Sequence, residues 1–312
     1  MPDSSAFIQA GTRPEVIEEI GTAALARTWR QDFNIDTGPL FNGIPTLRLC
    51  RDRATNRVFF DPPVAGSPDF YAQLRRFDWY HPSNKAEHCL AGATIGPEDR
   101  VLDIGAGDGA FRDHVNGAAY EGLEFDPHSA QRARDRGRNI SGRTLSRVAA
   151  EVAGGTQQPY TVATAFQVLE HMPDPDAFVA DALRCLTPDG RLIVGVPDRD
   201  TYVSALPDFA LNAPPHHLTW WNAGSIRALL HGHGVRHLTF HWTPVEHWER
   251  RLWWMARVAR RFQRPGATRF GPSRRRMKIF AWLMAGLLQA IKRPADVRGA
   301  TLVATARKPD VI

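Results

Sequence analysis

Three glycines at alternate positions form the stretch of this sequence that is best suited to hold a ligand. Gly105, Gly107 and Gly109 follow a short apolar run at 101–104, which predicts a buried parallel strand. Glycine adopts positive φ angles and has no Cβ, so a ligand can lie directly against the backbone. Because a helix is predicted from Phe111 onward, the strand, turn and helix predict a nucleotide-sized site at the carboxyl end of a sheet strand.

A carboxylate further along the chain indicates that the ligand contains adenosine. Glu124 ends a second predicted strand over 119–124. A carboxylate at the tip of that strand can accept hydrogen bonds from both ribose hydroxyls. The cofactor class stays open at this point, because Gly105-x-Gly107-x-x-Ala110 also fits the loose dinucleotide fingerprint.

Two later motifs distinguish between the cofactor classes. A predicted buried strand from Tyr160 ends in Leu-Glu-His at 169–171, and a later loop reads Pro-His-His-Leu at 215–218. Together with the glycine turn, these motifs resemble the class I S-adenosylmethionine-dependent methyltransferases, in their small-molecule or glycan-type branch. A nicotinamide-dependent dehydrogenase has no use for either motif and is the weaker alternative.

The resemblance implies a fold, a cofactor and a reaction. The fold is α/β, with a doubly wound, seven-stranded Rossmann-like sheet in a methyltransferase domain over 90–308. The cofactor is S-adenosyl-L-methionine, the reaction is direct displacement of its methyl group, and Glu124 holds its ribose. The implied cofactor-binding residues are Asp103, Gly105, Ala106, Gly107, Gly109, Glu124, Phe125 and Gln167.

Two histidines are the candidate catalytic residues. His217 stands at the histidine of the branch's Pro-Arg-His-Leu sequence, and His216 stands where arginine is usual. A histidine can deprotonate a hydroxyl acceptor, because its unperturbed pKa of about 6.5 is near working pH. Packing or helix capping is the alternative role for both. The histidine spacing predicts no metal site.

Some positions depart from the family pattern. Thr161 and Gln167 stand where the family often has acids, although the Gln167 amide can still touch the donor or the acceptor. Glu170 and His171 are predicted as a structural pair that holds the loop. A non-catalytic scaffold that keeps the sheet is therefore the alternative function, against which the intact glycines and Glu124 argue.

The remaining pattern alternates between helices and strands, which predicts a parallel sheet. Further strands are predicted at 145–152, 191–196, 235–242 and 301–307, and helices at 127–137, 176–186 and 223–231. A helix is also predicted over 69–91, where an aromatic cluster would pack in the core or form a lid.

The N-terminal extension, residues 1–89, is predicted to carry a helix and a hairpin. Pro14 and three glutamates predict a helix over 14–30, and two short strands are predicted at 46–50 and 57–60. The hairpin resembles the end of a zinc-ribbon module. Only Cys50 stands there, and a tetrahedral site needs four ligands, so no zinc is expected.

Composition indicates an ordinary globular chain. It has 312 residues, a net charge of +6 and three separated cysteines without a CxxC pair. These features, with no signal-peptide pattern and no spanning apolar run, predict a cytoplasmic protein.

The segment 244–298 is predicted as an inserted pair of basic, tryptophan-bearing helices around a Gly/Pro loop. It carries many arginines, few acids and an apolar run at 279–288. We expect this segment either to contact the inner face of a membrane or to pack in a homo-oligomer, and the two are equally favoured. Binding to nucleic acid is less favoured, because bulky apolar residues contribute little to such an interface. The acceptor is expected to be a small molecule, a glycan or a lipid-linked sugar.

Overall fold

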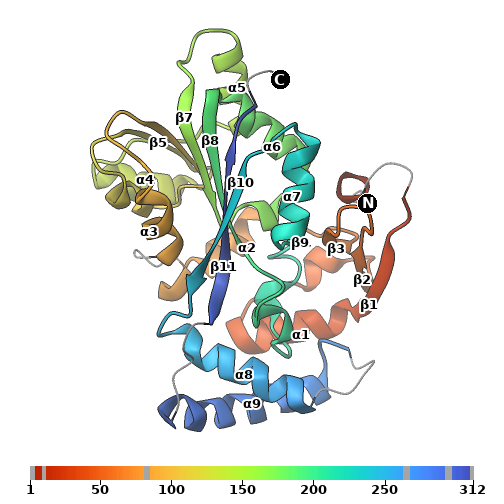
Figure 1. Ribbon diagram of the computed structural model, residues 1–312. Helices are drawn as coiled ribbons and strands as arrows, with labels where there is room; N and C mark the ends of the chain where they lie inside the picture. The colour runs from red at the N-terminus through yellow and green to blue at the C-terminus, as the bar shows by residue number, and fades with distance from the viewer. Residues whose placement is uncertain (1–3, 9–11, 81–84, 263–267, 292–296, 310–312) are drawn as a thin grey trace. The chain divides into compact units, whose positions relative to one another are not determined.

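The computed structural model describes residues 4–8, 12–80, 85–262, 268–291 and 297–309, without the side chain of Ile291 (Figure 1). The chain divides into two compact units. Unit 1 comprises Met1–Arg76, Pro197–Asn222 and Trp242–Ala300, and unit 2 comprises Phe77–Val196, Ala223–His241 and Thr301–Ile312. Four residues of the predicted aromatic and basic clusters lie outside the described residues: His81, Arg264, Lys292 and Arg293.

The predicted seven-stranded α/β sheet is confirmed. Its strands lie in the order β10-β11-β8-β7-β4-β5-β6 (Figure 1), and the pairs β4–β5, β4–β7, β5–β6 and β7–β8 are parallel. The bounds are β4 Arg100–Ile104, β5 Ala119–Leu123, β6 Ile140–Ser141, β7 Tyr160–Phe166, β8 Leu186–Pro197, β10 Leu238–Pro244 and β11 Arg298–Arg307. The strand that carries the glycine turn therefore lies between β5 and β7.

Three of the helices described in unit 2 begin at side-chain caps. The helices described in this unit are α3 Ala86–Gly92, α4 Pro127–Asp135, α5 Leu145–Ala153, α6 Pro175–Arg184 and α7 Ala223–Gly232. The side chains of Asp126, Thr144 and Asp174 accept backbone N–H groups at the starts of α4, α5 and α6.

Two elements predicted in this unit are wrong. The predicted strand at 145–152 is helix α5, because Thr144 caps it and apolar residues recur at Leu145, Val148, Ala149 and Val152, the period of a helix. The third strand is instead the two-residue β6. The helix predicted from Phe111 is only a 3₁₀ turn, Ala110–His114, since β5 begins five residues later.

Unit 1 contains a second, four-stranded sheet in the order β1-β2-β3-β9. Its strands are β1 Glu15–Gly21, β2 Thr46–Arg51, β3 Val58–Asp61 and β9 Thr219–Trp220. The predicted hairpin is confirmed as β2 and β3. The predicted helix over 14–30 is wrong in its first half, because the β-branched residues Val16, Ile17 and Ile20 form β1, which pairs antiparallel with β2.

The helices of unit 1 are α1 Thr22–Phe33, α2 Pro68–Leu74, α8 Glu249–Phe262 and α9 Pro272–Ile291. The expected helix over 69–91 is divided, since α2 ends at Leu74 and α3 begins at Ala86. The predicted pair of basic helices is confirmed as α8 and α9, which pack through small residues such as Ala256 and Ala281. No described helix is long and apolar enough to cross a membrane.

Candidate functional site

The glycine turn follows β4 and is fixed to the neighbouring strand by its own backbone. Gly105 and Ala106 both donate their N–H groups to the Leu123 carbonyl at the end of β5, at 2.9 and 3.0 Å. Gly105, Gly107 and Gly109 have φ angles of 73°, 58° and 77°. A Cβ at Gly105 would lie 2.6 Å from Val168 Cγ2, so this position needs glycine for both conformation and space.

Glu124 is attached to this turn. Its Oε2 accepts the Gly107 N–H at 2.9 Å, and its Oε1 accepts the Asp126 N–H at 2.8 Å. The side chain is buried, at 8% exposure. Each carboxylate oxygen has two lone pairs, so the oxygens have the capacity to accept hydroxyl groups of a ligand as well.

Asp103 lies beneath the turn rather than on its surface. It is 2% exposed and accepts hydrogen bonds from Tyr120 Oη at 2.7 Å and Thr164 Oγ1 at 2.8 Å. Burial raises the pKa of Asp103 to about 6, although both hydroxyl donors act to lower it. Asp103 therefore joins β4 to β5 and β7, and its geometry is that of a residue that positions the turn.

Phe125 is exposed to solvent, whereas Gln167 is surrounded by polar partners. Phe125, directly after Glu124, is 70% exposed. Gln167 has a φ angle of 56° after β7 and donates its backbone N–H to Gly195 O at 2.8 Å. Its amide nitrogen lies 3.3 Å from Thr301 Oγ1 and 3.4 Å from Glu87 Oε1.

Glu87 is a residue that the sequence did not single out. It comes from α3, is 5% exposed and contacts Gln167 in the segment that follows β7. The only signal for it was a glutamate inside an aromatic, helix-forming stretch. That pattern is typical of a solvated helix face, so the sequence pointed away from a buried position.

The Leu-Glu-His segment forms a 3₁₀ turn, Leu169–His171, directly after β7. Glu170 is 1% exposed, and burial raises its pKa to about 8, with the Lys85 charge opposing this shift. His171 Nε2 lies 4.0 Å from Glu170 Oε1, which is longer than a hydrogen bond. The structural role of this segment therefore rests on the burial of Glu170 more than on its contact with His171.

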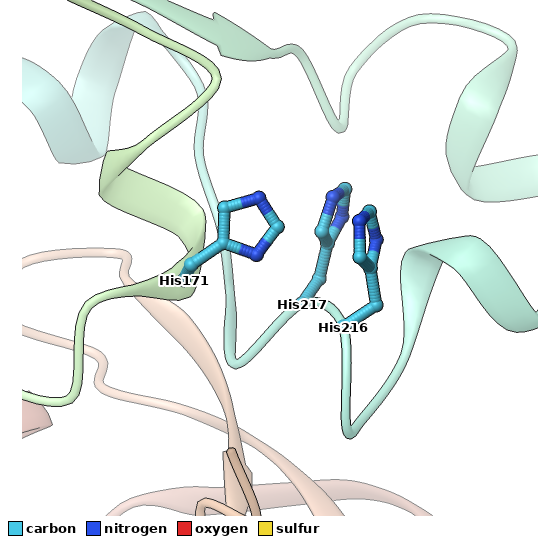
Figure 2. A group of neighbouring side chains, drawn as sticks. All are labelled: His171, His216 and His217. Carbon is cyan, nitrogen blue, oxygen red and sulfur yellow. The ribbon is translucent and has the colours of Figure 1, made fainter. Parts of the chain in front are cut away.

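The two candidate catalytic histidines lie side by side in unit 1, in the loop before β9. Figure 2 shows the rings of His216 and His217 stacked, with centroids 4.5 Å apart. His216 Nδ1 lies 2.8 Å from the Leu211 carbonyl, and His217 Nδ1 lies 3.1 Å from Asn212 Oδ1. In the tautomer that donates from Nδ1 to these oxygens, Nε2 is the basic nitrogen of each ring.

Aromatic side chains surround His216. The rings of Trp29, Phe70 and Tyr71 have centroids 6.2–6.4 Å from that of His216. His216 therefore packs in an aromatic cluster, and these contacts together with its stacking on His217 fit a supporting role for His217.

Comparison with known proteins agrees with this geometry. The family model described as a methyltransferase domain matches residues 71–239, more than half of the chain. The chain therefore belongs to this methyltransferase family, as the resemblance to class I S-adenosylmethionine-dependent enzymes predicted, and S-adenosylmethionine is the cofactor of that class.

Two curated relatives illustrate the sequence similarity. A ubiquinone biosynthesis O-methyltransferase of Salmonella paratyphi A is 30% identical over 105 residues, which cover 32% of this chain and 43% of the relative. A 27-O-demethylrifamycin SV methyltransferase of Amycolatopsis mediterranei is 35% identical over 105 residues, covering 31% and 38%. The chain spans less than half the length of the curated relatives that it matches.

A solved structure supports the fold. A methyltransferase of Thermotoga maritima, described as a possible histamine N-methyltransferase, aligns with a TM-score of 0.50 at 17% sequence identity. The alignment covers 77% of this chain and 97% of that protein. At this identity the likeness concerns the fold alone.

Proposed function

We propose that this chain transfers a methyl group from S-adenosylmethionine to a small-molecule acceptor. The observation that carries the proposal is the bond between Glu124 and the Gly107 N–H, which joins a ribose-type carboxylate to a glycine turn at the ends of β4 and β5. Family membership supports the same cofactor. S-adenosylmethionine supplies a methyl group that is already activated by its sulfonium charge.

The residues of this chain would act by binding and orientation. The backbone of 105–109 would hold the methionine portion, and the Glu124 oxygens would accept the ribose hydroxyls. Phe125, exposed beside Glu124, offers an aromatic face to the adenine. Gln167 would touch the donor through the oxygen of its amide. Catalysis of a displacement with an activated donor is mostly positioning, which these residues provide.

The proposed acceptor group is a hydroxyl, with His217 as the base and His216 as its support. Two relatives are named as O-methyltransferases or as acting on an O-demethyl compound, which favours this class. Asn212 Oδ1 orients the His217 ring through Nδ1, and in this orientation Nε2 would take the hydroxyl proton. A sugar or lipid-linked hydroxyl is included in the proposal, as is action in the cytoplasm.

Calorimetric titration with S-adenosylmethionine, its demethylated product and NAD tests the cofactor. Binding of the first two alone is expected. Binding of NAD, or of no ligand, would support the dehydrogenase or the non-catalytic scaffold.

A pair of variants tests His217 as the base. His217→Ala is compared with His237→Ala, a histidine outside the candidate site, in methyl transfer to a hydroxyl acceptor. Turnover should be lost only in His217→Ala, and equal turnover of the two variants across pH would remove His217 from the reaction.

A further inference from the structure

An ordinary surface helix turns its apolar side inward, but α9 turns charged side chains into unit 1 and exposes apolar ones. Arg275 and Lys278 point into unit 1, where both bind the Asp32 carboxylate of α1. Lys278 Nζ also donates to the Asp208 carbonyl at 3.0 Å, and Arg275 lies 3.4 Å from the Asp208 carboxylate. Arg274 is buried and donates to the Thr268 carbonyl. Charge-assisted hydrogen bonds therefore fix the inner side of α9 in its first half, and Ala281 and Ala285 pack against α8 further along the helix.

The opposite side of α9 is an apolar stripe. Ile279, Leu283 and Leu287 follow one another at intervals of four residues and are 54%, 56% and 64% exposed. Such spacing places them on one face of a helix. Phe280 is exposed beside them, and Phe262 at the end of α8 contacts it with ring centroids 5.6 Å apart. We call these five residues the apolar stripe.

The helix that carries the stripe is held in one orientation. The guanidinium of Arg251 in α8 lies 3.3 Å from the centroid of the Trp282 ring and donates to the Trp282 carbonyl. A Cβ at Gly286 would lie 3.2 Å from the same guanidinium, so Arg251 crosses α9 closely at this point. With the Asp32 bonds on the inner side, this contact keeps α9 from rotating and burying its stripe.

Positive charge borders the stripe. Arg276 lies one turn before Phe280, and Arg257, Arg260 and Arg261 are exposed near the end of α8. Glu249 is the single acid within the two helices, and it is buried with Tyr202 Oη bound to it at 2.8 Å. The surface around the stripe is therefore cationic.

We propose that the outward face of α9 and the end of α8 bind the surface of an anionic lipid bilayer. The apolar stripe would enter the boundary between headgroups and acyl chains, with α9 lying in the plane of the surface. The arginines would meet lipid phosphates, and the aromatic rings of Phe262 and Phe280 suit the interfacial depth. The charge complementarity between arginine and anionic headgroups selects this partner.

Two other partners fit the charge pattern less well. In a symmetric dimer the same cationic patch lies on both sides of the interface, so like charges would be brought together. Nucleic acid would use the arginines, but aliphatic side chains such as Leu283 and Leu287 find no favourable contact on a phosphate backbone. A bilayer satisfies both the apolar and the cationic part.

Flotation of the purified full chain tests the proposal, with vesicles of phosphatidylcholine alone and of phosphatidylcholine mixed with phosphatidylglycerol. Binding to the anionic vesicles is expected, weakened by salt. Leu283→Glu and, separately, Leu287→Glu should each weaken it about tenfold, since each loses buried apolar surface. Arg261→Glu should weaken it about fivefold or more. Ile17→Glu, a matched change at an exposed isoleucine of β1, should leave binding unchanged.

Several outcomes would overturn the proposal. They are absence of wild-type binding, equal binding to both kinds of vesicle, and equal effects of Leu283→Glu and Ile17→Glu. A dimer in sedimentation velocity that Leu283→Glu abolishes, without vesicle binding by the wild type, would assign the stripe to a second copy. The flotation contains no methyl donor, so its result is independent of the proposed reaction. Unchanged melting and donor affinity of Leu283→Glu exclude misfolding.

Discussion

Carboxylates are held by different kinds of donor in two regions of this molecule. At the ends of β4 and β5, Glu124 accepts two backbone N–H groups and Asp103 accepts two hydroxyls. In unit 1, by contrast, Asp32 binds Arg275 and Lys278, and Glu18 binds Arg269.

The two kinds of donor differ in how much of the carboxylate's charge they leave uncompensated. A neutral donor orients a carboxylate without cancelling its charge, whereas a cation close to it cancels most of the field. Glu124 and Asp103 are therefore oriented by neutral donors, whereas Asp108 within the turn pairs with Arg136 at 2.6 Å. Asp32 and Glu18 use their charge to attach α9 and Arg269 to the rest of unit 1.

The largest expected effect concerns Glu170, whose pKa burial raises to about 8. Between about pH 4.5 and 8 the unfolded chain has lost this proton while the folded chain keeps it, so the free energy of unfolding falls as pH rises. The slope approaches 1.4 kcal/mol per pH unit, a change on the order of 5 kcal/mol over the window. In Glu170→Gln this contribution to the slope should vanish. Denaturant unfolding at several pH values measures it, with exposed Glu98→Gln as control, and parallel slopes would contradict the prediction.

Glu124→Ala tests the ligand side of the comparison. The substitution removes the acceptor for the Gly107 and Asp126 N–H groups and for the proposed ribose hydroxyls. Lost hydrogen bonds to a charged group cost about 1.5–3 kcal/mol, so affinity for S-adenosylmethionine should fall about tenfold to a hundredfold. Calorimetry measures this fall, and Glu98→Ala, at an exposed residue before β4, should bind normally. An unchanged affinity would remove Glu124 from the site.

Asp32→Ala tests the unit 1 side. It leaves Arg275 and Lys278 without their shared carboxylate, which should lower the free energy of unfolding by about 1–3 kcal/mol. Hydrogen exchange should increase most in α9. Asp181→Ala breaks the surface pair with Arg184 and should cost less than about 1 kcal/mol. Equal losses in the two variants would show that the Asp32 cluster behaves as an ordinary surface pair.

Phe125→Ala should have the smallest effect. The ring is exposed, so its removal should leave the free energy of unfolding nearly unchanged. A lost aromatic contact with adenine is worth about 1 kcal/mol, which is about a fivefold loss of donor affinity. Trp248→Ala, a change at another exposed aromatic residue, is the control in the same titration, and equal affinities would place Phe125 outside the donor site.

The glycine-turn region could be predicted because its signals are local. The strand at 100–104, the turn at 105–109 and Glu124 lie within 25 residues, and each side chain or φ angle acts on a near neighbour. The supporting role of Asp103 could not be predicted, because its partner Thr164 comes from a strand about sixty residues away. Glu87 was missed for the same reason, since its contact with Gln167 depends on tertiary packing.

Elsewhere, the prediction from sequence was wrong or incomplete where the hydrophobic periodicity was ambiguous or where a residue's contacts lie far away along the chain. Residues 145–152 are rich in small and β-branched side chains that suit a strand, but the Thr144 side chain caps this segment as a helix. Residues 15–21 carry glutamates typical of a first helical turn, but pairing with β2 overrode that preference. The two basic helices were predictable from composition. The direction in which α9 turns its arginines was not, because Asp32 lies more than 240 residues earlier.

The interleaving of the two units along the chain has a consequence for synthesis. Unit 1 needs residues from before 77 and from as late as 300, while unit 2 needs the intervening segment and β11. Neither unit is complete when the ribosome has made only the first two thirds of the chain. The hairpin of β2 and β3 must wait for β9, about 160 residues later, and β10 and α8 emerge before β11. Such non-local closure slows folding, whereas the contacts within helices α4 to α6 are local and can form before the rest of the chain is made.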